Sequence, residues 1–142
     1  MTSSLRIGVL TSLYPAPERP FEGIFAQRRW SGMLDRGHDV RVCQPTPRVP
    51  WPLGSLFPRR FGDLQRRPSE ELQGGISIQR PRYRHISKRP VGNAKRFAKA
   101  GMDNLVSSSW RPDIVVCDYA WPAGAAAPLG QSLGIPVVLS GR

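Results

Sequence analysis

Short apolar runs, separated by helical patterns, constrain the fold of this chain more than any other feature of its sequence. Residues 5–13 (LRIGVLTSL), 114–117 and 135–142 are dense in Val, Ile and Leu at consecutive positions. A run of this kind is typical of a parallel strand buried on both faces, whereas a strand with one wet face alternates apolar and polar residues. The sequence therefore predicts several central parallel strands.

A helical pattern follows the first of these strands. Residues 24–36 place apolar side chains on one face of a helix, and Gly37 can take the left-handed conformation that ends one. Residues 38–45 (HDVRVCQP) then predict a second strand. Strand, helix and strand in this order form the right-handed crossover unit of parallel sheets. We therefore expect an α/β fold: a Rossmann-like open parallel sheet with helices on both faces.

The C-terminal third continues the alternation. A second helix is predicted over residues 93–110, with Asn93 as its N-cap. A third helix has Pro122 in its first turn and Gly134 as its stop, and Pro128 should kink or split it.

Residues 45–73 are expected to lack regular structure over most of their length. Prolines cannot continue a helix or a sheet ladder, so we predict a basic, proline-rich variable loop. A loop of this length is more often functional or mobile than structural. A glycine turn then leads into a strand over residues 74–84. The prolines are Pro45, Pro47, Pro50, Pro52, Pro58 and Pro68.

The formal net charge of +11 is concentrated in the middle of the chain. Residues 48–99 contain thirteen Lys and Arg against three Asp and Glu, a net of +10. Such a field attracts phosphate groups, an acidic membrane surface or nucleic acid, although arginines can also serve only to keep a loop soluble. The basic surface that we assign to an anionic partner comprises Arg80, Arg82, Arg84, Lys88, Arg89, Lys95 and Arg96.

A length of 142 residues suits one domain with a sizeable core. No apolar run approaches the ~18 residues of a membrane span, and no small-residue cleavage site follows the first strand, so we expect no anchor and no secretory leader. Cys43 and Cys117 fall within predicted buried strands and are expected to be reduced core thiols. The expected location is the cytoplasm, including the periphery of the inner membrane face.

Ligands of open α/β sheets bind outside the carboxyl ends of the strands, and the loops 14–23, 118–122 and 140–142 are predicted to lie there. Gly23 could present the N–H groups of the following helix start to an anion, or only ease the chain into that helix. The sequence contains no GxGxxG and no Walker motif. Asp118 could accept a proton from a hydroxyl nucleophile; the alternatives are a helix cap and a partner for a loop arginine.

Other chemistries find less support. The two histidines are far apart in the sequence and the cysteines form no close pair, so no metal site is predicted. Trp51, Phe57 and Tyr83 lie among the arginines and could stack on nucleic acid. They are irregularly spaced and no nucleic-acid-binding motif is present, so closure of loops over the core is the commoner role.

Two long stretches of the sequence carry specific series of motifs. Residues 5–45 show a strand, an aromatic-Pro pair, a loop ending in Gly-Ile-Phe, an amphipathic helix and then Arg-Gly-His-Asp-Val. Residues 111–142 show a strand, an aromatic-Pro-x-Gly turn, a small-residue helix ending in Leu-Gly-x-Pro, and a strand ending in Ser-x-Arg. Together these motifs resemble family 4 glycosyltransferases of the GT-B fold, and the resemblance covers nearly the whole chain except its variable middle.

The resemblance implies retaining transfer of a sugar from a nucleotide-sugar co-substrate, with no other cofactor, to a glycan or lipid-linked acceptor. The family performs it in a cleft between two Rossmann-like domains, of which the N-terminal one mainly holds the acceptor. The donor-binding Glu-x7-Glu motif of the second domain does not occur in this sequence. We therefore expect residues 1–142 to be a truncated acceptor-side domain of a hexosyltransferase, inactive by itself.

The resemblance also implies site residues. Asp118 falls where many members carry a cleft histidine, and Ala123 where many carry aspartate, so the histidine's role does not transfer directly. The candidates are Asp118 as catalytic residue, Gly23 and Gln27 in the acceptor and donor-phosphate loop, and Tyr119, Trp121 and Arg142 in the cleft. The rival interpretation is a non-enzymatic basic module that binds RNA or an anionic membrane surface through residues 48–99, with nucleic acid the less expected partner.

Overall fold

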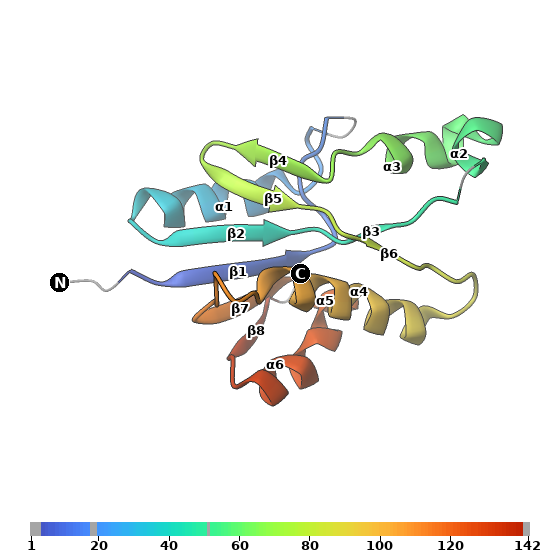
Figure 1. Cartoon of the computed structure of the whole chain (residues 1–142). Helices are drawn as coiled ribbons and strands as arrows, with labels where there is room; N and C mark the ends of the chain where they lie inside the picture. The colour runs from blue at the N-terminus through green and yellow to red at the C-terminus, as the bar shows by residue number, and fades with distance from the viewer. Residues whose placement is uncertain (1–3, 18–19, 51, 141–142) are drawn as a thin grey trace.

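The computed structural model describes residues 4–17, 20–50 and 52–140. Its main sheet has six strands in the order β4-β5-β2-β1-β7-β8, and every neighbouring pair is parallel except β4 and β5 (Figure 1). This confirms the predicted open, mostly parallel sheet; the antiparallel edge strand was not predicted. The strands are β1 (Arg6–Thr11), β2 (Asp39–Cys43), β4 (Glu70–Gln73), β5 (Ile76–Gln79), β7 (Ile114–Asp118) and β8 (Val137–Ser140).

The centre of the sheet is apolar on both faces, as the continuous apolar runs require. β1 lies between β2 and β7, with Leu10 opposite Cys43 on one side and Cys117 on the other. All three side chains are fully buried, and neither cysteine is in a disulfide. Both cysteines are therefore core thiols outside any disulfide, as predicted.

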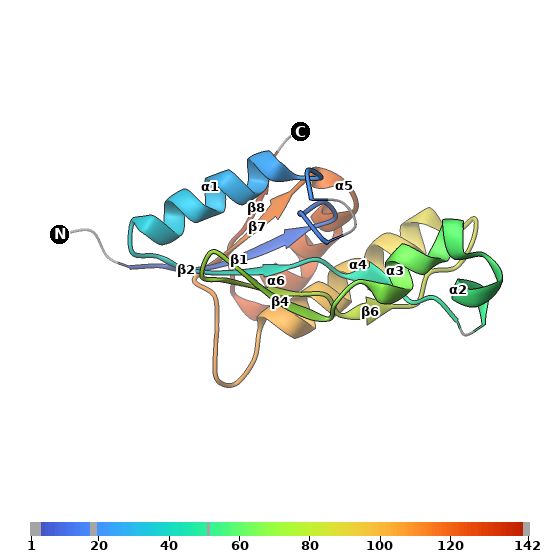
Figure 2. The ribbon, with the colours of Figure 1, turned by 90° about the horizontal axis from the view of Figure 1, so that it is seen from above.

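Helices cover both faces of the sheet (Figure 2). On one face, α1 (Ile24–Asp35) packs Ala26 and Trp30 against the strands β1, β2 and β5. On the other face, α4 (Pro90–Leu105) packs together with a chain of short helices. These are α5 (Ala120–Ala123), the 3₁₀ helix η2 (Gly124–Ala126) and α6 (Ala127–Leu133), so the predicted third helix is split where Pro128 enters α6 and ends at Gly134.

Two boundaries of α4 differ from the prediction. The helix begins at Pro90, whose missing N–H is harmless in a first turn. Asn93 is not its N-cap: the side chain instead bonds the backbone N–H and C=O of Ile86, at 2.8 and 2.7 Å. The helix ends at Leu105, where Val106 takes an extended conformation, and beyond it the backbone N–H of Ser107 donates to the Trp110 carbonyl oxygen.

The prediction that residues 45–73 lack regular structure is wrong. Between the prolines the chain forms β3 (Thr46–Pro47), α2 (Leu53–Leu56), the π-helix η1 (Pro58–Gly62) and α3 (Asp63–Arg66). The prolines stand at boundaries, where they break nothing: Pro52 precedes α2, Pro58 begins η1 and Pro68 follows α3. We call residues 52–67 the lobe; it projects beyond the carboxyl ends of the strands (Figures 1 and 2).

The strand predicted over residues 74–84 is divided. β5 ends at Gln79, and after Arg80 and Pro81 the chain forms β6 (Arg82–Tyr83), which pairs with β3 in a separate two-stranded sheet. Within the part of the chain described, no helix is both long and apolar enough to cross a membrane.

Candidate functional site

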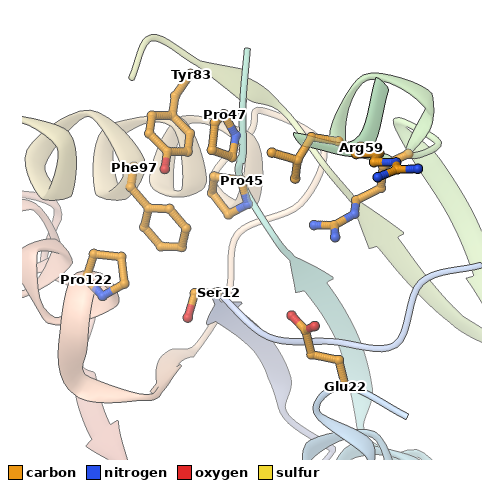
Figure 3. Close-up of a pocket in the computed structure, with 10 residues that line it drawn as sticks. Ser12, Glu22, Pro45, Pro47, Arg59, Tyr83, Phe97 and Pro122 are labelled. Carbon is orange, nitrogen blue, oxygen red and sulfur yellow. The ribbon is translucent and has the colours of Figure 1, made fainter. Parts of the chain in front are cut away.

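A cavity of about 450 Å³ opens where β1 and β2 end. Ser12 directly follows β1 and Pro45 lies two residues after β2, so the cavity occupies the carboxyl edge of the sheet, as expected for an α/β fold. Figure 3 shows its labelled side chains arranged around a common space. The lining residues are Ser12, Glu22, Pro45, Pro47, Arg59, Leu64, Arg67, Tyr83, Phe97 and Pro122.

The cavity has one apolar wall. Tyr83 and Phe97 meet edge to face, with ring centroids 5.7 Å apart and planes at 85°, and three prolines extend this surface. Burial raises the pKa of Tyr83, against the opposing effect of Arg96, so its hydroxyl stays protonated at neutral pH and can donate a hydrogen bond. Such a wall suits the apolar face of a sugar ring or another flat, partly polar ligand.

The opposite wall is polar. Ser12 and Glu22 come from the two ends of the loop after β1, while Arg59 and Arg67 come from the lobe. Hydroxyl and carboxylate oxygens can accept hydrogen bonds from ligand hydroxyls, and guanidinium groups fit phosphate or carboxylate. The arrangement can therefore orient a polyhydroxylated ligand that also carries negative charge.

Gly23 ends the loop of residues 14–23, which we call the acceptor loop after its predicted role, in a conformation that requires glycine. Its φ is +73°, and a Cβ built on it would lie 2.6 Å from the carbonyl oxygen of Leu13. The chain can thus fold back tightly over the end of β1 before α1 begins, which brings Glu22 into the cavity wall. The predicted loop borders the cavity; contact between the α1 N-terminus and donor phosphates stays a prediction.

Gln27 lies behind this loop and does not line the cavity. Its side-chain amide donates to Gln73 Oε1 at 2.7 Å, and Gln73 Nε2 donates to the carbonyl oxygen of Pro15 at 2.8 Å. The β4 strand therefore braces the loop through a relay of two glutamines. In this arrangement Gln27 positions the loop, and its contact with a ligand stays a prediction.

Arg80 was predicted to belong to an exposed basic surface, and this is wrong. Its side chain is fully buried, and the guanidinium finds acceptors in three segments of the chain, at residues 15, 44 and 68–71. Nε donates to Gln44 Oε1 at 2.9 Å, Nη2 to the Pro15 carbonyl oxygen at 3.0 Å and Nη1 to the Pro68 carbonyl oxygen at 3.2 Å. Nη1 also pairs with Glu71 Oε1 at 2.8 Å. Arg80 thus joins the acceptor loop to the base of the lobe.

Asp118 lies at the carboxyl end of β7, as predicted, but it is buried and does not line the cavity. One carboxylate oxygen accepts from Arg29 Nη1 at 3.0 Å and the other from Trp30 Nε1 at 2.7 Å. Of the alternatives, the arginine partner is the one observed, although the arginine comes from α1 and not from a loop. Because both oxygens are occupied by α1, the carboxylate fastens this helix to the sheet; its catalytic role stays a prediction.

The charge of Asp118 affects the ionisable groups around it. Arg29 also donates to Ser140 Oγ at 3.3 Å, so the same guanidinium links β7 to β8. Tyr14 is buried nearby, with no hydrogen-bond partner for its hydroxyl among the described residues. Burial and then the Asp118 charge raise the pKa of Tyr14, while Arg80 lowers it. Desolvation and the same carboxylate raise the pKa of Cys117 to about 12. Both groups are therefore neutral at physiological pH.

The remaining described cleft candidates, Tyr119 and Trp121, follow β7. Tyr119 is half-buried with a φ of +68°, a strained conformation for a residue other than glycine, and Trp121 is 61% exposed. Neither lines the cavity, although their neighbour Pro122 does. Arg142 lies outside the described residues.

The other predicted basic residues divide by exposure. Arg82 is half-buried and donates to the backbone oxygens of Arg80, Leu64 and Arg67, so it braces the lobe. Arg96 is half-buried and donates to the backbone oxygen of Arg84 at 2.7 Å. The exposed members are Arg84, Lys88, Arg89 and Lys95. For these four, an anionic partner stays a prediction.

Sequence reasoning missed most of the cavity wall. Ser12 and Pro45 fall at the carboxyl ends of predicted strands, and the rule for these ends could have found them. Phe97 could not be recognised, because at helical spacing it is indistinguishable from a core residue. Arg59 and Arg67 lie within residues 45–73, which were predicted to lack regular structure. Within the described ranges, no cluster of three or more His, Cys, Asp and Glu side chains could hold a metal ion.

Comparison with known proteins gives matches over nearly the whole chain. A family model described as a glycosyl transferase 4-like domain matches residues 23–141. A Bacillus subtilis (strain 168) protein named as a teichuronic acid biosynthesis glycosyltransferase, TuaC, is 30% identical over 139 residues, which are 96% of this chain and 36% of that protein.

Solved structures match the fold. The catalytic domain of starch synthase IV from Arabidopsis thaliana, bound to ADP and acarbose, aligns with a TM-score of 0.60 at 14% identity, over 92% of this chain and 31% of that one. The glycotransferase of kitacinnamycin aligns with a TM-score of 0.49 at 15% identity, over 98% and 30%. The chain therefore spans about a third of the length of these proteins.

Proposed function

This chain belongs to the glycosyl transferase 4-like family and has the mostly parallel α/β fold of GT-B catalytic domains, and we propose that it forms the acceptor-binding side of a glycosyltransferase cleft. The observation that carries the proposal is the cavity at the carboxyl edge of the sheet, with an aromatic and proline wall facing a polar one. A wall of the first kind packs on a sugar ring, and Ser12 and Glu22 accept hydrogen bonds from its hydroxyls.

The acceptor in this proposal is a glycan or lipid-linked saccharide that carries negative charge. Arg59, which is exposed, supplies the cationic part of the cavity wall, whereas Arg67 also lines the cavity but is buried. The curated relative is named for the biosynthesis of teichuronic acid, a product that its name marks as acidic. The reaction is transfer of a sugar from a nucleotide-sugar with retention of the anomeric configuration.

The donor-binding residues, in the same proposal, lie outside this chain. The chain spans 36% of the curated relative, and the proposal assigns its cavity to one side of a cleft. A single wall can orient the acceptor, but turnover also requires a grip on the nucleotide-sugar and its leaving phosphates. The isolated chain should therefore bind acceptor without consuming donor.

Two measurements test this function. First, the isolated chain is incubated with UDP-glucose or UDP-N-acetylglucosamine, and release of UDP is followed; robust release would overturn the claim that the donor site lies elsewhere. Second, binding of farnesyl diphosphate-linked N-acetylglucosamine is compared with that of the uncharged octyl N-acetylglucosaminide by calorimetry. Saturable binding that favours the charged ligand is expected.

A pair of arginine variants locates the binding. Arg59→Ala removes an exposed guanidinium from the cavity wall and should weaken binding of the charged ligand by about five- to tenfold. The matched control is Arg28→Ala, which removes an exposed arginine of α1 that does not line the cavity. Equal effects of the two variants would show that net charge, and not the cavity, attracts the ligand.

A further inference from the structure

The lobe exposes large apolar side chains at its outer end. Leu56 is 64% exposed and Phe57 is 53% exposed, at the end of α2. The Phe57 ring contacts Phe61 of the same lobe, at a centroid distance of 6.4 Å. Neither Leu56 nor Phe57 lines the cavity. Adjacent apolar side chains left in water on a projecting segment are a surface that a partner can cover.

Cationic side chains accompany this apolar tip. Arg59 and Arg66 are exposed in the same lobe, and Arg84, Lys88 and Arg89 are exposed on the segment that leads to α4. Apolar side chains beside arginines match the boundary of an anionic bilayer, where the former enter the acyl region and the latter meet lipid phosphates. RNA fits less well, because it needs successive aromatic side chains for its bases, and Phe57 is the one exposed aromatic among the lobe's described side chains.

The lobe is held in a fixed place relative to the cavity. Arg82 donates to the backbone oxygens of Leu64 and Arg67, and Arg80 donates to that of Pro68. The lobe projects past the ends of the strands, while its Arg59, Leu64 and Arg67 line the cavity (Figures 1 and 3). A surface that binds the tip therefore lies next to the part of the cavity wall that the lobe supplies.

We propose that the lobe docks on an anionic lipid bilayer, inserting Leu56 and Phe57 while its arginines meet lipid phosphates. The docked lobe presents the cavity to headgroups at the bilayer surface. This last step rests on the proposed function, since it needs an acceptor carried by a lipid; the docking itself does not.

Vesicle flotation tests the docking. The whole chain is mixed with vesicles of phosphatidylcholine alone or of phosphatidylcholine with phosphatidylglycerol. Binding is expected to the anionic vesicles, and it should fall as salt is raised because exposed arginines contribute. Equal binding to neutral vesicles, or no binding to either, would overturn the proposal.

Matched double variants separate insertion from general stickiness. Leu56→Ser with Phe57→Ser should reduce partitioning into anionic vesicles by about tenfold or more. The control, Phe25→Ser with Leu72→Ser, also removes one exposed Phe and one exposed Leu, at 65% and 73% exposure, but outside the lobe. It should leave partitioning unchanged, and thermal unfolding checks that both variants fold. Equal loss of vesicle binding in the two double variants would contradict membrane docking. Membrane docking would also be contradicted if poly-uridine competed with the vesicles for the chain and the lobe variant abolished this competition.

The soluble ligand keeps the two proposals distinguishable. Because Leu56 and Phe57 do not line the cavity, the lobe variant should bind farnesyl diphosphate-linked N-acetylglucosamine as the unmodified chain does. Vesicle binding without binding of this ligand would refute the acceptor function and leave the docking in place. The reverse result would refute the docking alone.

Discussion

The arginines of the middle third lie in two contrasting regions of the molecule. Beneath the acceptor loop, Arg80 is fully buried, and its guanidinium is satisfied by Gln44, Glu71 and two backbone carbonyls. In the lobe, Arg59 is exposed and lines the cavity. The positive charge of an arginine therefore does not define its role. A buried guanidinium forms its hydrogen bonds within its own chain, and only an exposed one is available to a partner.

The largest effect is expected from breaking the buried region. Arg80→Met removes the guanidinium that neutralises Glu71 and leaves the carbonyl oxygens of Pro15 and Pro68 without this donor. Loss of one member of a buried ion pair costs about 3–5 kcal/mol of unfolding free energy. Urea unfolding measures it.

The matched control for Arg80 is Arg84→Met, which removes an exposed arginine four residues later. Its unfolding free energy should change by no more than about 0.5 kcal/mol. If the two variants were equally stable, the division of the arginines into a structural and an available set would fail.

The acceptor loop provides the next largest effect. Gly23→Ala places a Cβ 2.6 Å from the carbonyl oxygen of Leu13, at a φ of +73° that L-residues avoid. The loop must shift, and we expect a loss of about 2–3 kcal/mol in unfolding free energy together with weaker acceptor binding.

A glycine inside α1 controls for helix propensity. Gly32 lies inside the helix, and a Cβ added there would meet nothing within 4 Å, so Gly32→Ala should stabilise the chain by about 0.5–1 kcal/mol. Destabilisation by both substitutions would mean that α1 tolerates no added methyl, and the special role assigned to Gly23 would be lost.

Local patterns explain what could be predicted of the fold. The runs that form β1 and β7 are apolar at consecutive positions, and Ala26 and Trp30 mark the buried face of α1. The local sequence of each element is therefore enough to predict it. The carboxyl-edge rule then correctly placed the loop after β1 at the cavity. None of these inferences required knowledge of distant contacts.

The rest depends on partners that are distant in the sequence. Arg80 bonds Pro15, 65 positions away, and Asp118 bonds Trp30, 88 positions away, so no local pattern distinguishes these charges from exposed ones. The lobe was missed for another reason: its prolines stand between short helices, and a count of prolines does not show where each one falls.

The exposed tip of the lobe should matter little for stability, in contrast to the region beneath the loop. Leu56→Ser with Phe57→Ser gives up little buried surface and one aromatic ring contact, so the unfolding free energy should fall by less than about 1 kcal/mol. Urea unfolding beside Arg80→Met measures the contrast directly. A loss as large as that of Arg80→Met would show that the tip packs against the body, which would remove the basis for docking.

The smallest effect on stability is expected at the amino edge of the sheet, where the exposed carboxylate of Asp113 stabilises the fold. Asp113 accepts a hydrogen bond from the backbone N–H of Arg6 at 2.8 Å, and this bond, followed by the side chain of Arg6, holds the pKa of Asp113 below its usual range. A carboxyl whose pKa is lower in the folded chain contributes stability above its ordinary pKa, and the contribution disappears as the pH falls through the folded value. The unmodified chain should therefore be more stable than Asp113→Asn at neutral pH, and the difference should shrink below about pH 4. Unfolding curves of the two proteins from neutral to acid pH measure it, and a difference that stayed constant or grew on acidification would mean that the hydrogen bond to Arg6 does not depend on the carboxylate charge.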